Sequence, residues 1–521
     1  MSVARRVSYP APEQVASPTT PTGTGESFKG SESSRLLCSA AYLNSAFREQ
    51  VIQHCLDDEH RAIGPTFGVD LTTIVRHCQN AQRQLGRRDW WLLVPLLAIA
   101  AVWLSVSNSN AVAPGDPTYP LLIFAAASLW GFAVILWFKW RPHTLVARNF
   151  LRGKFDPDQM LGKDDSKVEH LAASENGNVL IYSGFTPFVG SGVNLNGWSF
   201  ALDLSKSADL ELSTAHPEPK ASGTSETGSA ADRVTVEELY VRMSQDIRAL
   251  HLDRVTIDDK MYVNGRDIRD DKRFLSHPLA RPQNHVAPEV IKSAMLQSEQ
   301  RLRHYRCIRV VDWSGELVLS IFLRFSKLSH NLFVEASYFL LTPVASPYRE
   351  VDSMTSHLTL RKITTMVVYS MFVSQLLIAF APFLLLWRLL RRLNRWSHRR
   401  EEKKQILENP SFDYGATFSV RQWSSSVSYH RYFQMLDKEM YFKVLEKTIL
   451  DSILTLLEER NIDVSELKQR QTTILNNGVI VSGGNLTASG LAVGEGAKTL
   501  TTVTNKISQF TAHATAASGG K

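Results

Sequence analysis

A glycine-rich loop is the first segment whose residue types could support chemistry. Gly184, Gly190 and Gly192 lie in the stretch 183–192 (SGFTPFVGSG), directly after a predicted strand. Loops in this position can present backbone N–H groups to a phosphate. The stretch has no Lys-Ser/Thr pair, however, and Pro187 removes one amide donor. The sequence therefore favours a structural turn, and the three glycines are its candidate ligand-binding residues.

Four residues in the N-terminal part have the side chains of metal ligands. They are Cys55, His60, His77 and Cys78. Their spacing matches no zinc pattern, and two neighbouring residues on a helix point about 100° apart. Four cysteines in the whole chain are also too few for a disulfide framework. We expect core thiols and surface histidines, with no metal site and no cofactor.

Signatures of catalysis are missing from the sequence. It contains no Gly-x-Ser-x-Gly elbow, His-Glu-x-x-His or Ser-x-x-Lys. The acidic pairs 258–259 and 270–271 resemble solvated charges in turns, not a catalytic pair in a cleft. The aromatic and charged groups at 304–306 and 312–313 could line a pocket. The sequence therefore identifies no catalytic residue and leaves the question of enzyme activity open.

The net charge of +7 is concentrated beside apolar stretches. A basic juxtamembrane run at 388–404 includes Arg388, Arg391, Arg392 and Arg395. Its position next to an apolar stretch predicts anionic lipid headgroups as the partner of these four arginines. Nucleic acid is the other partner of basic surfaces, and we do not expect it here.

Three apolar stretches have the length of membrane spans. Residues 90–107 and 119–138 carry no charge over 18 and 20 positions, and 363–387 is apolar over 25 positions. About 20 apolar residues cross a hydrocarbon layer of about 30 Å. The sequence therefore predicts a transmembrane helical hairpin at 90–138 and a multi-pass protein of the cell membrane, in contact with the lipid bilayer. The charges flanking 363–387 conflict, so this third segment either crosses once or re-enters.

Shifts in composition divide the rest of the chain. Pro, Ser, Thr and Gly dominate a disordered leader, 1–34, while the tail, 473–521, is Gly-rich and β-prone. Helical spacing of apolar residues predicts a helical segment at 35–89 and a helical C-terminal region at 405–472.

Residues 155–358 read as a soluble α+β domain. Its segment 206–232 is rich in Ser, Thr, Glu and Gly and reads as a flexible insertion, followed by a helix at 235–250. The pair Asn264-Gly265 ends one strand and is a hairpin signal. We therefore expect an antiparallel sheet. The predicted strands are 178–182, 198–204, 254–264, 308–312, 317–325 and 332–341.

A long amphipathic helix is predicted from Tyr429 to Arg460, with Asn461 as its terminator. Its apolar face either packs on its own domain or self-associates as a short coiled coil. The Gly-rich tail either stacks as strands and turns or remains a flexible segment. These alternatives leave open a homo-oligomer with a C-terminal self-assembly region.

Several segments resemble a family of bacterial multi-pass membrane proteins with no assigned activity. The resemblance extends from Cys38 to Lys498 and implies the same layout, without any catalytic residue to carry over. The segments are Phe185–Gly192, Trp198–Leu204, Tyr262–Asp271, His304–Phe325, Asn331–Pro343 and Arg470–Gly484.

Together these features predict an integral membrane protein that is not an enzyme. Its fold class would be α+β, with a transmembrane hairpin, a third apolar segment and a C-terminal helix. The domain at 155–358 would sense or bind a partner. The alternative is a membrane-anchored enzyme with its active site in that domain.

Overall fold

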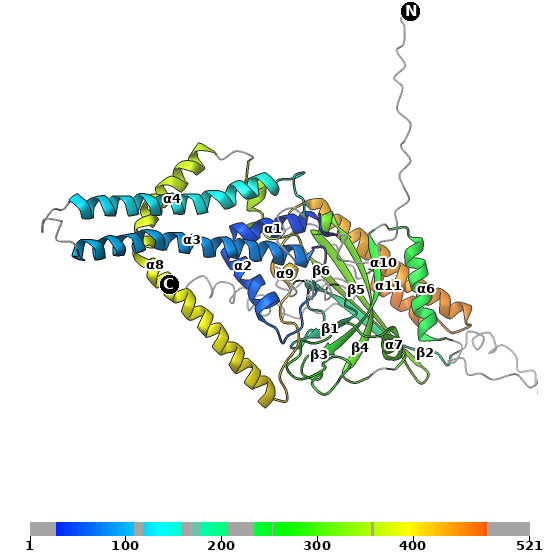
Figure 1. The fold of residues 1–521 in the computed structure, drawn as a ribbon. Coiled ribbons are helices and arrows are strands. Elements are labelled where there is room, and N and C mark those ends of the chain that lie inside the picture. The colour runs from blue at the N-terminus through cyan, green and yellow to red at the C-terminus, as the bar shows by residue number, and fades with distance from the viewer. Residues whose placement is uncertain are drawn as a thin grey trace, which may run out of the picture.

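A six-stranded mixed β-sheet forms the centre of the protein (Figure 1). The computed structural model describes residues 28–108, 118–157, 168, 171, 175, 177–206, 234–252, 254–297, 299–355 and 359–476. The strand order is β1-β3-β4-β5-β6-β2, and every neighbouring pair is antiparallel except β1 and β3, which are parallel. The strands are β1 (Val179–Tyr182), β2 (Val193–Asp203), β3 (Val255–Asn264), β4 (Leu302–Asp312), β5 (Leu317–Leu328) and β6 (Asn331–Leu341).

The six predicted strands all form, but the expectation of an antiparallel sheet is wrong at one edge. The chain returns to the sheet after β2 and a helix, so β3 pairs with β4 on one side and lies parallel to β1 on the other. Asn264-Gly265 ends β3 as predicted, yet it does not close a tight hairpin. A long connection containing α7 (Pro288–Leu296) leads to β4 instead, and Gly265 packs against Gly415.

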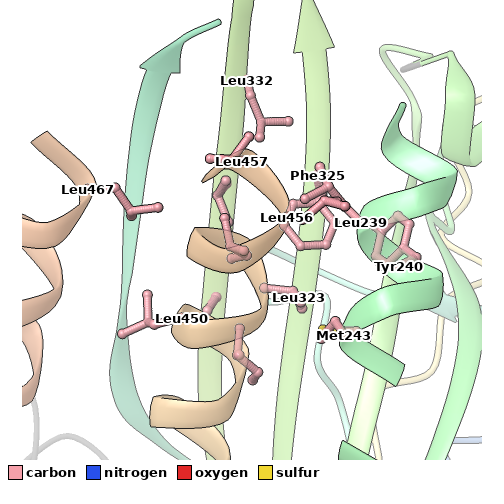
Figure 2. Close-up of a cluster of buried hydrophobic side chains, with 14 of the residues drawn as sticks. Leu239, Tyr240, Met243, Leu323, Phe325, Leu332, Leu450, Leu456, Leu457 and Leu467 are labelled. Atoms are coloured by element: carbon pink, nitrogen blue, oxygen red, sulfur yellow. The ribbon is translucent and has the colours of Figure 1, made fainter. Parts of the chain in front are cut away.

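Three helices cover one face of the sheet: α6 (Val236–Ala249), α10 (Tyr432–Glu459) and α11 (Ser465–Asn476) (Figure 1). Leu450, Leu456 and Leu457 of α10 belong to one cluster of buried side chains with Leu323 and Phe325 of the sheet (Figure 2). The C-terminal half of the predicted amphipathic helix therefore packs its apolar residues on its own domain, whereas Leu436, Met440 and Val444 in the N-terminal half are 37–50% exposed. The structure thus shows packing on the same domain for the C-terminal half of this face.

Local signals in the sequence explain where these helices begin and end. Thr235 and Glu238 form a reciprocal capping box at the start of α6. Asn461 adopts a φ of +55° just after α10 and terminates it, as its residue type predicts. Asp70 caps α3, because its carboxylate accepts the N–H of Thr73 at 3.2 Å.

The N-terminal helices pack beside the turns that follow β4 and β6 at one end of the sheet, and the segment 62–69 reaches over the face opposite α6 and α10. The N-terminal helices comprise α1 (Glu32–Leu43), α2 (Ser45–Ile52), a π-helical turn (Gln53–Asp57) and the start of α3 (Leu71–Asn108). The helical segment predicted at 35–89 is thus divided, because Asn44 leaves the helical conformation and caps α2 through the N–H of Phe47. The shorter elements are the 3₁₀ turns Trp313–Gly315, Ser346–Tyr348 and Glu350–Ser353 and the helix α9 (Val420–Trp423).

A buried arginine fastens the segment before α10 to the sheet. Nη2 of Arg421 donates to the carbonyl oxygens of Gly315, Glu316 and Thr342 at 2.7–3.2 Å. Nearby, Ala416 forms a bridge with Tyr182 at the end of β1. Residues around α9 therefore hold the N-terminal segments and the sheet in one fold.

The apolar stretches predicted to span a membrane lie within α3, α4 (Thr118–Asn149) and α8 (Leu360–Glu408). Over the residues described, no helix has both the length and the apolar content needed to cross a bilayer. The predicted hairpin at 90–138, the third span at 363–387 and the multi-pass membrane protein are therefore wrong, and so is the membrane-anchored enzyme.

The physical reason is that an uncharged stretch predicts a helix that avoids water without specifying what it packs against. The three long helices contact one another, and α3 and α4 run side by side (Figure 1). Leu92 of α3 is buried against Val134 and Ile135 of α4. Each helix also continues well beyond its apolar stretch, and α8 extends through the basic run to Glu408.

Candidate anion-binding site

Two adjoining cavities lie between the sheet and the N-terminal segment 62–69, on the face that α6 and α10 do not cover. The inner cavity has a volume of about 30 Å³. The outer cavity has a volume of about 250 Å³. Pro65, Glu175 and Lys260 line both, so the two cavities meet at these residues.

Strand register places the polar residues of the inner cavity in one row. Thr256 of β3, Arg309 of β4 and Ser320 of β5 are directly opposite one another in the antiparallel ladder. Opposite residues in such a ladder share a face, and residues two or four positions along a strand return to it. Lys260, four positions beyond Thr256, therefore lies on the same face. Thr256, Arg309 and Lys260 line the inner cavity.

Arg309 is the residue that most needs explanation, because its side chain is buried with part of its hydrogen-bonding capacity unused. It is 3% exposed. Its Nη1 lies 3.6 Å from Oδ2 of Asp258, and its guanidinium carbon lies 3.8 Å from the ring centroid of Phe67. Among the residues that the structure describes, Nε and Nη2 have no hydrogen-bond partner.

The neighbours of Arg309 in the row share this property. The hydroxyl oxygens of Thr256 and Ser320 also have no hydrogen-bond partner within the described ranges. Buried polar groups are normally paired, and each one left unpaired costs about 1–3 kcal/mol. A run of three such residues, two of which line a cavity, is typical of a surface that binds a ligand.

Two further cations extend this surface into the outer cavity. Lys260 donates from Nζ to the carbonyl oxygen of Gly177 at 3.0 Å, and burial together with Arg309 lowers its pKa. Arg281 donates from its guanidinium to the carbonyl oxygens of Asp58 and Glu59. Burial lowers the pKa of Arg281, while the charges of Asp58 and Glu59 oppose that change.

Glu175 is the carboxyl group at the junction of the two cavities. Its Oε1 accepts the N–H of Leu71 at 2.6 Å and the hydroxyl of Thr66 at 3.4 Å. Burial, with Asp70 nearby, raises the pKa of Glu175 to about 8. The carboxyl group is therefore largely neutral at pH 7. The carboxylate of Asp258 then lies beside Arg309, while those of Asp58 and Glu59 lie near Arg281.

The glycine loop lies elsewhere on the same face of the sheet. Gly190 donates its N–H to Oε1 of Gln422 at 2.6 Å, and a Cβ on Gly192 would lie 2.1 Å from the carbonyl oxygen of Leu340. Gly184 has open space around its Cα. The loop also inserts Phe188, which stacks on Phe322 at a centroid distance of 4.2 Å. Ligand binding by Gly184, Gly190 and Gly192 stays a prediction, and these contacts give Gly190 and Gly192 a role in packing.

The four arginines predicted to contact lipid headgroups have their backbone in α8. The side chains of Arg388, Arg391, Arg392 and Arg395 lie outside the described part of the chain. Their contacts with headgroups stay a prediction.

The acidic pair at 258–259 lies inside β3 and not in a turn, so that expectation was wrong. Asp259 accepts from Nε2 of His304 at 2.9 Å and from two nitrogens of Arg306 at 2.7 and 2.9 Å. Burial opposes its ionisation, but these hydrogen bonds hold the pKa of Asp259 well below its usual range. Arg306 also donates to Ser244 of α6. The group therefore ties α6 to the sheet.

The other residues considered for chemistry take part in packing. Trp313 donates from Nε1 to Asp437 of α10 at 2.9 Å. Cys55 and Cys78 are buried, as expected for core thiols. His60 and His77 are buried too, so the expectation of surface histidines was wrong. His60 pairs with the carbonyl oxygen of Leu279, and His77 with the hydroxyl of Tyr42.

Sequence reasoning missed the residues that line the two cavities. A signal was present in β4, where Arg309 interrupts the apolar run CIRVV within a predicted strand. A cation between two β-branched residues of a strand lies in apolar surroundings, so it either pairs with an acidic group or lines a binding site. The partners of Arg309 across the sheet, and the segment 62–69 that covers it, could not be read from that pattern.

Comparison with known proteins gives one match. No curated protein and no solved structure matches the chain. The family model of the AbeC-like domain matches residues 197–488, which is more than half of the chain. This span contains Thr256, Lys260, Arg281 and Arg309, while Pro65 and Glu175 lie before it. The description of the family names no activity, and the chain belongs to the AbeC-like domain family.

Proposed function

We propose that this protein binds a small anion in the two adjoining cavities. The observation that supports the proposal is the buried guanidinium of Arg309, whose Nε and Nη2 lack partners in the described structure and which lines the inner cavity. Guanidinium N–H groups match the oxygens of phosphates and carboxylates. An anion there would satisfy donors that otherwise destabilise the fold.

The charge of the surroundings supports an anion over a neutral ligand. Lys260 and Arg281 add two cations, and the carboxyl group of Glu175 is mainly neutral at pH values below its pKa of about 8. In a partly dehydrated cavity the attraction between opposite charges is several-fold stronger than in water. The surface is thus suited to hold an oxyanion without a metal ion as intermediary.

Binding of inorganic phosphate and sulfate, measured by isothermal titration calorimetry on the full chain, tests the proposal. Arg309→Gln should abolish binding, because it removes the charge and the fork of donors. Thr256→Val keeps the volume of the side chain and removes only the hydroxyl, so it should weaken binding about five-fold or more. Arg301→Gln is the matched control, since the Arg301 side chain is 72% exposed just before β4.

Circular dichroism of each variant establishes that it is folded before it is titrated. If Arg309→Gln fails to fold, Thr256→Val still tests the same cavity. The proposal would be contradicted if the wild type bound no phosphate and no sulfate. It would also be contradicted if the wild type and both cavity variants bound these anions equally.

A further inference from the structure

The two cavities differ in size in a way that indicates what kind of anion they accept. The inner cavity, at about 30 Å³, is small enough to restrict a ligand to one terminal group of a few atoms. The outer cavity is about 250 Å³ and accepts a larger organic group. We propose that the ligand is a small organic molecule with two acidic ends, one terminal oxyanion at Arg309 and a second at Arg281. This inference rests on the proposed function and specifies its ligand.

The walls of the inner cavity restrict it to a terminal group. Phe67, Val69 and Val311 line it together with Arg309, and all four are buried. Lys260 lines both cavities, whereas Thr256 and Arg309 line the inner one alone, so an oxyanion that reaches Arg309 from the outer cavity would pass Lys260. A phosphate diester carries a second ester arm, for which the buried apolar walls leave no path. The head of the ligand is therefore a phosphate monoester or a carboxylate.

The outer cavity combines apolar walls with a second cation. Ile63, Leu180 and Pro282 supply apolar surface for the body of the ligand. Arg281 is held in place by its hydrogen bonds to Asp58 and Glu59, which use Nε and Nη2. In the part of the chain that the structure describes, Nη1 of Arg281 makes no hydrogen bond, and it is free to donate to an acidic group.

Lys260 and Glu175 connect the two subsites. Both line both cavities, so one molecule that occupies the two cavities must pass between them. Lys260 can donate to the head, and the neutral carboxyl group of Glu175 can donate its proton to an oxygen of the ligand. A single inorganic anion would use the Arg309 subsite and leave Arg281 without a role in binding.

A titration series separates this inference from the proposed function. The probes are inorganic phosphate, glycerol 3-phosphate, 3-phosphoglycerate, glutarate and the diester glycerophosphocholine. We expect the two-acid probe 3-phosphoglycerate to bind about ten-fold more tightly than glycerol 3-phosphate, because it adds one charge-assisted hydrogen bond. Glycerophosphocholine should not bind. Tighter binding of glutarate than of 3-phosphoglycerate would identify the head as a carboxylate.

The variants assign the two ends. Arg281→Gln should reduce the ratio of the affinities for 3-phosphoglycerate and glycerol 3-phosphate to about one, whatever its effect on inorganic phosphate, while Arg309→Gln should abolish binding of every probe. Arg301→Gln serves again as the control. The two-ended ligand would be overturned if the diester bound as tightly as the monoester, or if Arg281→Gln kept the preference for two acidic ends. In either case, phosphate binding that depends on Arg309 would still support the proposed function. Loss of all anion binding by the wild type would overturn both.

Discussion

Glu175→Gln tests the charge state of the cavity through the pH dependence of stability. The pKa of Glu175 rises from 4.5 to about 8 on folding, because burial disfavours its charged form. The folded protein then holds a proton that the unfolded chain releases between these two pH values. This contribution to stability is fully present below pH 4.5 and is lost as the pH rises through about 8.

The magnitude follows from linkage. Each pH unit inside this window costs about 1.4 kcal/mol of unfolding free energy when a single proton is involved. From pH 5 to pH 8 the loss is about 4 kcal/mol at most, and partial contact with solvent reduces it to about 2–4 kcal/mol. Glutamine remains neutral and can still accept the N–H of Leu71, so the Glu175→Gln variant should lack this decline.

Urea denaturation of both proteins at pH 5, 6, 7 and 8 measures the effect as a difference between two curves. Other titrating groups contribute equally to both and cancel in the difference. Glu289→Gln, an exposed change in the first turn of α7, provides the control and should follow the wild type. Coincident pH profiles for wild type and Glu175→Gln would refute the argument that the cavity keeps this carboxyl group neutral.

Five substitutions test the packing of the fold. Gly192→Ala should destabilise the fold by about 3 kcal/mol, because its φ is +93° and the new Cβ would meet a carbonyl oxygen of β6 at 2.1 Å. Gly184→Ala, with a similar φ and open space, should cost only about 1 kcal/mol, and equal losses for the two glycines would contradict this account. Leu450→Ala should cost about 3 kcal/mol in urea denaturation because the side chain is fully buried under the sheet. Leu436→Ala on the exposed side of the same helix should change stability by about 0.5 kcal/mol or less, and a loss like that of Leu450→Ala would show that this side is also covered. Thr235→Ala removes the capping box of α6 and should cost about 1 kcal/mol in thermal or urea unfolding, whereas an unchanged stability would show that the cap is dispensable.

The strands were predictable from sequence because their signals are local. Alternating and β-branched residues identified all six strands, and Thr235, Asn461 and Asp70 marked helix ends as their side chains suggest. The parallel pairing of β1 with β3 was not predictable, since the residues of a strand do not specify which neighbour it pairs with. The three apolar stretches correctly predicted helices, but the prediction that these helices span a bilayer was wrong. The hydrophobicity of a stretch does not specify what it packs against.

The site was harder to predict because its parts are distant in sequence. Arg309 lies on β4, whereas Phe67 above it comes from the segment before α3 and Glu175 from the region before β1. Each residue alone resembles an ordinary charged or aromatic side chain. Only the fold brings three polar residues of neighbouring strands into one buried row. The glycine loop, in contrast, is visible in the sequence because its residues are contiguous.

The edge strand β1 has a consequence for how this protein can be divided in the laboratory. β1 and the segment 62–69 both precede residue 197, where the family match begins. β1 nevertheless forms one edge of the sheet, and the segment 62–69 covers the cavities. A fragment cut at the limits of the match would expose the unpaired side of β3 and uncover the guanidinium of Arg309. The span of the family match and the span of the complete sheet with its cavities therefore have different boundaries in this chain.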